Sequence, residues 1–302
     1  MTGNNFICGA GGTNIDLLYS GMEKIPDIGE ELYSKDFSLQ LGGGLPATLI
    51  NLARLGIETK IATQLGSDIF SDFTKNEFEK AGANITNLYK GNKIPLTITS
   101  AVILPQDRTF FSFTGYSHPD DEMKEKFYNL AKGSKITLME IGGYLDVYKK
   151  LHDEGTLLVL DTGWDDSMSL EKYSDYLEIA DYYTPNQKEA KKITGKDTAE
   201  DAAYELNNYF DKVVIKLDKD GCLGIDDELF FVESINEYKN VDSTGAGDAF
   251  LAGFTYGLFH TYSFKDCILF GNITGGKAVT AVGALSSYLN EKELLEKFYE
   301  YK

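Results

Sequence analysis

An aspartate follows three small residues at the point where an apolar segment begins. Gly245, Ala246 and Gly247 precede Asp248, and apolar side chains then recur at helical spacing as far as Phe259. This spacing predicts a helix with one buried side. The first N–H groups of a helix have no internal partners and can hold an anion. The carboxylate of Asp248 can either cap this helix or take a proton from a hydroxyl beside the anion, and this segment alone leaves both readings open.

A second polar pair follows the first apolar segment of the chain. Asn14 and Asp16 fit a turn after a strand, and the glycines from Gly9 onward resemble part of a dinucleotide fingerprint. That fingerprint would indicate an NAD-dependent oxidoreductase. However, Asn14 stands in place of the third glycine, and the residues after it do not have the pattern of a phosphate-binding helix. The oxidoreductase is therefore the weaker alternative.

Alternating strands and helices must position these residues. Residues 6–8, 60–62, 135–139, 157–160 and 213–217 have the pattern of strands, and residues 47–55, 70–81, 198–210 and 248–259 have the pattern of helices. Strands that alternate with helices of this length predict βαβ units, with a mostly parallel sheet covered on both faces. The chain shows no internal repeat or linker, so we expect residues 1–302 to form a single domain.

Two segments, about 14–41 and 95–117, interrupt that alternation. Phe37 to Leu41 alternates apolar and polar side chains, as a strand with one buried face does. Residues 96–103 and 109–113 flank the turn from Pro105 to Arg108 and predict a β-hairpin. These segments predict a small β-sheet that projects from the α/β body. Such a sheet suits a lid over a ligand, or a surface through which two copies form a homodimer.

Composition limits the partners of the protein. The net charge of −18 argues against a nucleic-acid partner, because binding a phosphate backbone needs a basic surface. Three cysteines and three histidines are scattered along the chain, without the spacing of a disulfide framework, a zinc site or a Ser-His-Asp triad. No segment has the length and apolarity of a membrane span or of a signal peptide. We therefore expect a cytoplasmic protein with a small-molecule ligand and no membrane partner.

The segment from Asp242 to Gly253, DSTGAGDAFLAG, resembles the C-terminal signature of the PfkB family of ribokinase-like carbohydrate kinases. The family pattern is D-[ST]-[ST]-G-A-G-D-x-F-x-x-G, and every specified position agrees. The resemblance implies an α/β protein with three α/β/α layers, a mostly parallel central sheet and a small β-sheet lid. It also implies that Asp248 is the catalytic base of an ATP-dependent kinase. The N–H groups of Gly245, Ala246 and Gly247 would form the anion hole for the transferred phosphoryl group.

Two earlier segments resemble the sugar-binding side of the same family. Asn14 and Asp16 follow the first strand, where the family places a sugar-binding aspartate. Residues 42–56 resemble the N-terminal signature of the family but lack its usual asparagine, with Ala47 and Thr48 near its place. The resemblance therefore leaves open which sugar is bound. The acceptor-binding residues that it implies are Asn14, Asp16, Gly42, Gly43, Gly44, Thr48 and Glu140.

Further motifs resemble the nucleotide side of the family. Asn186 and Glu189 match an N-x-x-E motif that is associated with Mg²⁺ through water, and the same pair also fits a helix-capping box. Residues 213–221 resemble the strand and turn beside the nucleotide, with Asp218 where the family usually has glycine. The ATP-binding residues that the resemblance implies are Asn186, Lys216, Asp218, Gly221, Thr244, Gly245, Gly247, Asn272 and Gly275.

Many members of the family also bind a monovalent cation such as K⁺ beside the anion hole. By position, its ligands here would be mostly backbone carbonyls, which leave no side-chain pattern in the sequence. The residues so implied are Asp242, Thr244, Ala278, Ala281, Gly283 and Ser287.

The acceptor itself stays open among free sugars, nucleosides and sugar phosphates. The chain has only two arginines, Arg54 and Arg108, which argues against a phosphorylated acceptor because bidentate phosphate binding usually employs arginine. Asn14, Asp16 and the nearby glycines favour a free ribose- or fructose-like sugar. A nucleoside would need an aromatic partner for its base, and Tyr33, Phe111 or Phe113 in the expected lid could provide one.

Overall fold

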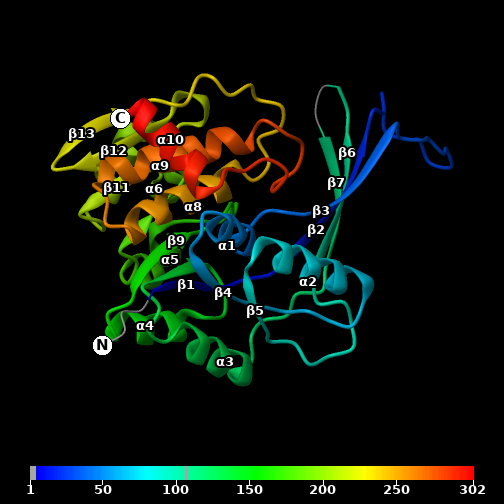
Figure 1. The fold of residues 1–302 in the computed structure, drawn as a ribbon, viewed down its shortest axis with the longest axis horizontal. Coiled ribbons are helices and arrows are strands. Elements are labelled where there is room, and N and C mark those ends of the chain that lie inside the picture. The colour runs from blue at the N-terminus through cyan, green and yellow to red at the C-terminus, as the bar shows by residue number, and fades with distance from the viewer. Residues whose placement is uncertain (1–4, 106–107) are drawn as a thin grey trace.

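Six short strands form a parallel sheet through the middle of the protein (Figure 1). The computed structural model describes residues 5–105 and 108–302. In spatial order the strands are β10 (Tyr182–Tyr183), β9 (Leu157–Asp161), β8 (Ile136–Glu140), β1 (Phe6–Ala10), β4 (Glu58–Thr63) and β5 (Asn84–Asn87). All pairs in this sheet are parallel. The predicted parallel sheet is therefore confirmed.

Helices cover both faces of the sheet and make three layers. On one face lie α1 (Leu45–Arg54), α2 (Ile69–Ala81), α8 (Ala246–Phe259), α9 (Phe264–Ala278) and α10 (Glu291–Tyr301). On the other lie α3 (Asp121–Ala131), α4 (Leu145–Asp153), α5 (Leu170–Leu177), α6 (Gln187–Thr194) and α7 (Ala199–Leu206). Successive strand residues enter opposite cores, since Ile7 packs in the first and Cys8 in the second. This alternation follows from the two-residue period of a strand.

Three antiparallel strands extend the central sheet layer beyond β10. They are β11 (Lys212–Lys216), β12 (Cys222–Asp226) and β13 (Glu228–Val232). A single parallel bridge between Asn186 and Lys216 joins them to the region after β10, where Lys216 N–H donates to Pro185 O at 2.9 Å. A short 3-10 turn, Asp218–Asp220, follows β11. The sequence patterns predicted β11 but neither β12 nor β13.

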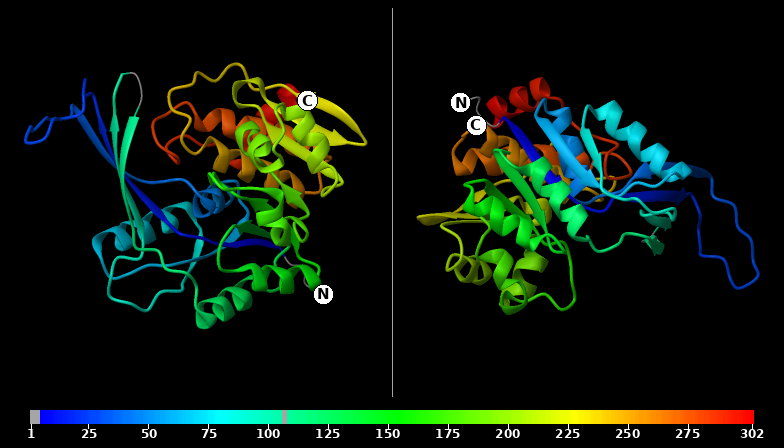
Figure 2. Two further views of the ribbon diagram at one scale, coloured as in Figure 1. Left: turned by 180° about the vertical axis from the view of Figure 1, so that it is seen from behind. Right: turned by 90° about the horizontal axis from the view of Figure 1, so that it is seen from below.

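A separate four-stranded sheet projects from the body, and we call it the lid (Figures 1 and 2). Its strands are β3 (Asp36–Leu41), β2 (Asn14–Ser20), β6 (Thr97–Ile103) and β7 (Arg108–Thr114), in that order. The predicted hairpin is confirmed by the antiparallel pairing of β6 with β7. Residues 106 and 107 of its predicted turn lie outside the described residues.

The two faces of the lid differ in chemistry. The register pairs Asp16 with Gln40 and with Thr99, and Thr99 with Ser112. Because side chains alternate along a strand, these residues share one face with Arg108, which we call the inner face. The opposite, outer face carries the apolar side chains of Leu17, Tyr19, Phe37, Leu39, Ile98, Val102, Phe111 and Phe113.

Helix α8 differs from the one-sided helix that the sequence predicts. Every residue from Ala249 to Gly257 is buried, because α9 packs along one side of α8 and α1 along another. Small residues allow this close packing: a Cβ on Gly253 would lie 2.4 Å from Phe270 O on α9. The prediction of a single buried side was wrong, since it assumed that the helix covers the sheet from outside. Within 5–105 and 108–302, no helix combines the length and hydropathy that crossing a bilayer requires.

Candidate active site

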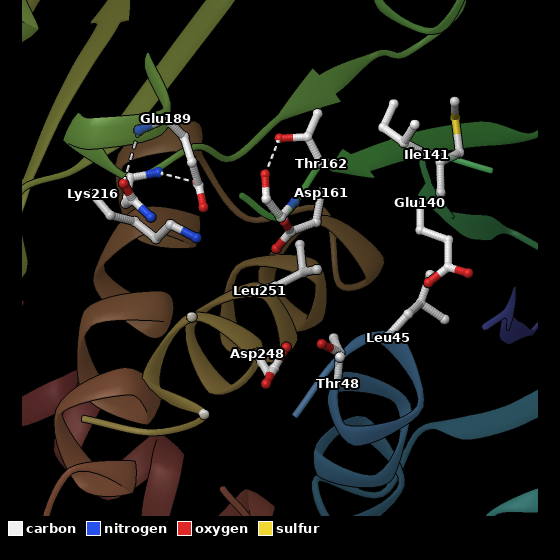
Figure 3. Close-up of a pocket in the computed structure, with 16 residues that line it drawn as sticks. Leu45, Thr48, Glu140, Ile141, Asp161, Thr162, Glu189, Lys216, Asp248 and Leu251 are labelled. Carbon is white, nitrogen blue, oxygen red and sulfur yellow. Dashed lines mark hydrogen bonds between the residues drawn. The ribbon is translucent and has the colours of Figure 1, made fainter. Parts of the chain in front are cut away.

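A cavity of about 380 Å³ opens where the carboxyl ends of β8 and β9 meet the first turns of α1 and α8 (Figure 3). In open α/β sheets this edge is the usual place for a ligand, because loops and helix N-termini converge there. The predicted site residues that line the cavity are Gly44, Thr48, Glu140, Asn186, Glu189, Lys216, Gly245, Gly247 and Asp248. They come from distant parts of the chain, so the fold brings these nine predicted residues together at one cavity.

Asp248 lies in the first turn of α8, with its carboxylate buried in the cavity wall. Burial, and then the negative charge of Asp161, raise the pKa of Asp248 to about 7, and the backbone N–H of Gly44 partly offsets this. In the described part of the chain, no backbone N–H of α8 donates to this carboxylate. The side chain therefore faces the start of α1 and does not act as a cap for its own helix. A carboxyl with a pKa near neutrality is suited to proton transfer.

The turn before Asp248 presents backbone N–H groups to the cavity. Gly245 is the N-cap residue at φ +77°, and a Cβ there would lie 2.5 Å from Ala284 O, so only glycine fits. The N–H of Ala246 bonds weakly to Ser243 O at 3.3 Å. The N–H groups of Gly245 and Gly247 donate to no other residue that the structure describes. Two of the three predicted donors are thus available to an anion.

Lys216 adds a positive charge beside this turn. Its Nζ lies 3.6 Å from the position that a Cβ on Gly247 would occupy. Lys216 ends β11, and its charge opposes the pKa increases of both Asp248 and Glu189. An ammonium next to free helix N–H groups makes a strong anion site. The residues that the sequence assigned separately to nucleotide and anion hole therefore meet here.

Glu189 and Asn186 form the predicted capping box at the start of α6. Asn186 Oδ1 accepts from the N–H groups of Lys188 and Glu189, and Glu189 Oε2 accepts from the N–H of Asn186 at 2.8 Å. The structural reading of this pair is confirmed. Glu189 is 7% exposed, and burial raises its pKa. Both residues line the cavity as well, so the cap also fixes a carboxylate where it can face a ligand.

Asp161 is a cavity residue that the sequence analysis missed. It ends β9 and pairs in register with Glu140 at the end of β8. Burial, followed by repulsion from Asp161, raises the pKa of Glu140 to about 8. Figure 3 shows the carboxylates of Asp161 and Asp248 facing the same space. Asp161 directly follows the predicted strand 157–160, so the rule that ligands gather at the carboxyl ends of parallel strands could have identified it.

The glycines 42–44 pass between two carboxylates. A Cβ on Gly42 would lie 2.8 Å from Asp16 Oδ2, and one on Gly43 would lie 2.5 Å from Asp248 Oδ2. Asn14 Nδ2 donates to Gly43 O at 3.2 Å and holds this segment in place. Burial raises the pKa of Asp16 to about 6. The predicted acceptor residues Asn14 and Asp16 and the carboxylate of Asp248 thus contact the same glycine segment.

Thr48 and Glu140 line the cavity from α1 and β8. The Thr48 hydroxyl is fully buried and has no hydrogen-bond partner in the described protein. Buried hydroxyls are nearly always hydrogen-bonded, so a partner from a ligand would satisfy it. Figure 3 shows Thr48 close to Asp248. Thr48, which lies near the place of the missing signature asparagine, therefore lines the cavity with an unsatisfied hydroxyl.

Five predicted ATP residues do not line this cavity: Asp218, Gly221, Thr244, Asn272 and Gly275. Asn272 Nδ2 donates to Val232 O and Glu233 O, and its Oδ1 accepts from Cys222, so the side chain fastens α9 to β13. Gly275 allows α9 to approach Ala246 O of α8. Gly221 lies in the tight turn before β12. Asn272 and the two glycines therefore contribute to the packing of α9 against α8 and to the turn before β12.

Asp218, also outside the cavity, explains the glycine that the family usually has there. It adopts φ +56°, in the left-handed region where glycine is favoured and aspartate is tolerated. Its Oδ2 accepts from Gln187 Nε2 at 2.8 Å. The backbone requirement is thus met by a residue whose side chain bonds to α6.

The predicted ligands of the monovalent cation include the carboxylate of Asp242, which already accepts hydrogen bonds from the protein. Asp242 Oδ1 accepts from the N–H and the hydroxyl of Thr244, and Oδ2 accepts from Gly283 N–H at 2.9 Å. Arg108 on the lid also reaches Oδ1, at 2.9 Å. The Ser287 hydroxyl pairs with that of Thr280 at 2.7 Å. These contacts do not fit a bound K⁺, because the one carboxylate of the set faces hydrogen-bond donors.

The first glycine-rich segment does not form a dinucleotide loop. Strand β1 ends at Ala10, and the lid strand β2 begins at Asn14 without an intervening helix. A Cβ on Gly9 would lie 2.5 Å from Leu45 Cδ2, so this glycine serves packing against α1. The NAD-dependent alternative therefore lacks the helix N-terminus on which it depends.

A buried carboxylate, facing an anion-binding turn beneath a β-sheet lid, defines a phosphotransferase site on an α/β body. The family model described as "pfkB family carbohydrate kinase" matches residues 7–291, and the chain belongs to this family. It is a sugar kinase, an ATP-binding phosphotransferase.

Curated relatives include a 2-dehydro-3-deoxygluconokinase from Bacillus subtilis, 25% identical over 298 residues and covering 87% of each chain. A ribokinase from Lactococcus lactis is 22% identical and covers 96% of each chain. Among solved structures, Arabidopsis thaliana ribokinase complexed with ribose and ATP superposes with a TM-score of 0.82 at 21% identity, over 97% of this chain and 98% of that one. A Methanocaldococcus jannaschii nucleoside kinase gives 0.82 at 19% identity, over 99% of both chains. These likenesses confirm the ribokinase-like fold.

Proposed function

We propose that the protein transfers the γ-phosphoryl group of ATP to a hydroxyl of a free sugar, with Asp248 as the general base. The observation that carries this proposal is the position of Asp248: its carboxylate is buried beside the N–H groups of Gly245 and Gly247 and across from Thr48. In the reaction the sugar oxygen bonds to the γ-phosphorus as the bond from that phosphorus to ADP breaks. The hydroxyl proton passes to Asp248.

The donors of the turn and Lys216 stabilise the charge that develops on the transferred group. Removing one such donor in comparable sites costs on the order of 10²–10³ in rate. Asp248 must be ionised to accept this proton, and its pKa of about 7 places that ionisation near neutral pH. Asn14, Asp16 and Glu140 would hold the remaining sugar hydroxyls.

Mg²⁺ fits the carboxylates on the nucleotide side. Glu189 and Asp161 line the cavity together with Lys216, and Mg²⁺ is commonly bound through one or two carboxylates, several waters and substrate phosphates. No group of three or more metal-binding side chains occurs among the residues described, which suits an ion shared with ATP. When bound, Mg²⁺ would neutralise phosphate charge. Glu189 would orient its water shell, and Asn186 would fix Glu189.

A neutral acceptor suits the charges of the site. Asp16, Glu140 and Asp248 place three carboxyl groups around the acceptor side, and an anionic substrate would have to approach them. The only nearby guanidinium, that of Arg108, already contacts Asp242. This supports a free ribose- or fructose-like sugar over a sugar phosphate. Because one relative is a 2-dehydro-3-deoxygluconokinase, sugar acids must also be tested as acceptors.

A nucleoside acceptor is less well supported. Phe111 and Phe113 lie on the outer face of the lid, opposite to Asp16, so neither can stack on a base held at Asp16. Tyr33 lies in the segment between β2 and β3 and is 82% exposed. Phe111 and Phe113 are therefore not candidates for stacking on the base of a nucleoside.

The decisive experiment compares the wild-type protein with Asp248→Asn. Pentoses, hexoses, sugar acids, nucleosides and sugar phosphates are screened for Mg²⁺-dependent ATP consumption and product formation. We expect a free sugar to be phosphorylated and the variant to lose about 10²- to 10⁴-fold in kcat, with ATP binding retained in calorimetry. Unchanged transfer in the variant would remove Asp248 from the role of base, and preference for a phosphorylated acceptor would overturn the substrate assignment.

We further propose that the chain forms one domain and pairs as a homodimer through the outer face of the lid. Phe37, Phe111 and Phe113 on this face are each more than half exposed, and clustered exposed aromatic side chains are typical of interfaces. Sedimentation velocity of Phe111→Ser tests this pairing, with Tyr299→Ser on α10 as the matched control. We expect only the lid variant to shift toward monomer. A wild-type monomer at micromolar concentration would contradict the proposal.

A further inference from the structure

The guanidinium of Arg108 lies where the lid meets the loop before the anion hole. Arg108 begins β7 on the inner face of the lid, and Nη1 donates to Asp242 Oδ1 at 2.9 Å and to Thr244 Oγ1. The two partners are 134 and 136 residues away in sequence. The side chain of Asp242 is 14% exposed and that of Arg108 is 37% exposed. This ion pair is thus more protected from solvent than a typical surface pair.

A second lid contact fixes the same region. Ser286 Oγ donates to Gln40 Oε1 at 2.9 Å, and a Cβ on Gly283 would overlap this oxygen, at 1.7 Å. Gln40 lies on the inner face of β3, and Gly283 donates its N–H to Asp242 Oδ2. The lid therefore contacts both the aspartate and the loop 281–287 that would supply the carbonyls of a cation site.

A metal ion and this guanidinium would compete for one oxygen. A K⁺ ion needs several oxygen ligands, and Asp242 is the one negatively charged residue among the predicted ligands. Its carboxylate already accepts hydrogen bonds from four donors, which belong to Arg108, Thr244 and Gly283. Two positive charges on the same carboxylate repel each other strongly at such distances. The carboxylate of Asp242 is therefore already paired with a guanidinium.

We propose that Arg108 replaces the monovalent cation, so that the lid carries the charge that balances Asp242 beside the anion hole. The inference concerns the anion hole of the proposed kinase, but it rests on contacts of the protein alone. It makes Arg108 a positioning residue, which acts on the turn from Thr244 to Gly247 through Asp242. The enzyme would then be insensitive to K⁺, and removal of the guanidinium would create a site for the ion.

The test measures ion binding through stability and does not require turnover. Thermal unfolding is followed in KCl and in tetramethylammonium chloride at equal ionic strength, because an ion that binds only the native state raises Tm. We expect the wild type to unfold at the same temperature in both salts. Arg108→Gln should unfold on the order of 2 °C higher in KCl than in tetramethylammonium chloride, and adding Asp242→Asn to it should abolish that difference.

Lys90→Gln is the matched control, since it removes a positive charge from an exposed ion pair with Glu122 and should show no K⁺ effect. A K⁺-selective rise in the wild type would overturn the proposal, as would a folded Arg108→Gln protein that shows none. Where turnover is measurable, the wild-type rate should be equal in the two salts. If no acceptor is phosphorylated, the kinase assignment fails while the unfolding result still decides the role of Arg108.

Discussion

Thr48 and Thr255 are two fully buried threonines whose hydroxyls have no hydrogen-bond partner within residues 5–105 and 108–302. They differ in position, because Thr48 lines the cavity and Thr255 lies inside α8, away from it. An unpaired buried hydroxyl costs free energy of unfolding unless a ligand satisfies it. Of the two hydroxyls, only that of Thr48 belongs to a residue that lines the cavity, where a ligand could satisfy it.

We predict that Thr48→Val raises KM for the sugar about tenfold, the usual effect of one lost hydrogen bond, without lowering the free energy of unfolding. Thr255→Val should leave both KM and kcat unchanged. Steady-state kinetics and urea denaturation of the two variants check this. An equal change of KM in both variants, or none in Thr48→Val, would remove Thr48 from the acceptor site.

The segment 42–44 matters at the scale of elements because it joins the lid strand β3 to helix α1. Gly44 has φ +106°, which a residue with a Cβ rarely adopts. Gly43 does not need glycine for its backbone, but a Cβ there would lie 2.5 Å from Asp248 Oδ2. The close approach of this segment to the Asp248 carboxylate therefore depends on the absence of a side chain at Gly43.

Gly43→Ala should consequently displace the Asp248 carboxylate and lower kcat by about 10², with little change in ATP affinity. Gly142→Ala is the control, since a Cβ on Gly142 meets no atom within 4 Å and its φ is not positive. Kinetics and ATP calorimetry on both variants measure the effect. Full activity in Gly43→Ala would show that the contact is dispensable.

The elements themselves were largely predictable, because their apolar periods are local. The predicted strands 6–8, 60–62, 135–139, 157–160 and 213–217 all exist, with ends shifted by a few residues. Strands such as β10, of two residues, and β12–β13 carry too little pattern to be recognised. The sequence did not predict that α8 is buried on all sides, because this burial results from the packing of α9 and α1 against it.

The site was predictable only where a motif marks it. Asp248 and the capping pair Asn186 and Glu189 carry such motifs, and the cavity contains them all. Asp161 has no motif, and its importance arises from strand pairing with Glu140. The contact from Arg108 to Asp242 spans 134 residues, and no local pattern indicates which surface a lid residue will meet.

At the scale of the whole molecule, the active site costs stability. Burial raises the pKa values of Asp16, Glu140 and Asp248 to about 6, 8 and 7. Below about pH 4 these carboxyls are protonated in both folded and unfolded chains. At higher pH the folded chain keeps protons that the unfolded chain releases. The free energy of unfolding therefore falls as pH rises through the folded-state pKa values.

We predict that Asp248→Asn unfolds at higher urea concentration than the wild type at pH 8, by about 1–2 kcal/mol, and that the difference shrinks at pH 5. The control, Asp153→Asn, changes a carboxylate whose side chain is 82% exposed and should behave as the wild type at both values. A difference that does not depend on pH would mean that Asp248 is not held in a protonated state by the fold.

The two faces of the lid give neighbouring residues different evolutionary constraints. Along β2, Asn14 and Asp16 lie on the inner face of the lid, while Ile15 and Leu17 lie on the outer face. Substitutions that change substrate preference should therefore accumulate at every second position, and those that change subunit pairing at the positions between. A mutant library that varies only the inner-face positions of β2 could alter substrate preference and preserve subunit pairing. A library of the outer-face positions could do the reverse, within the same seven residues.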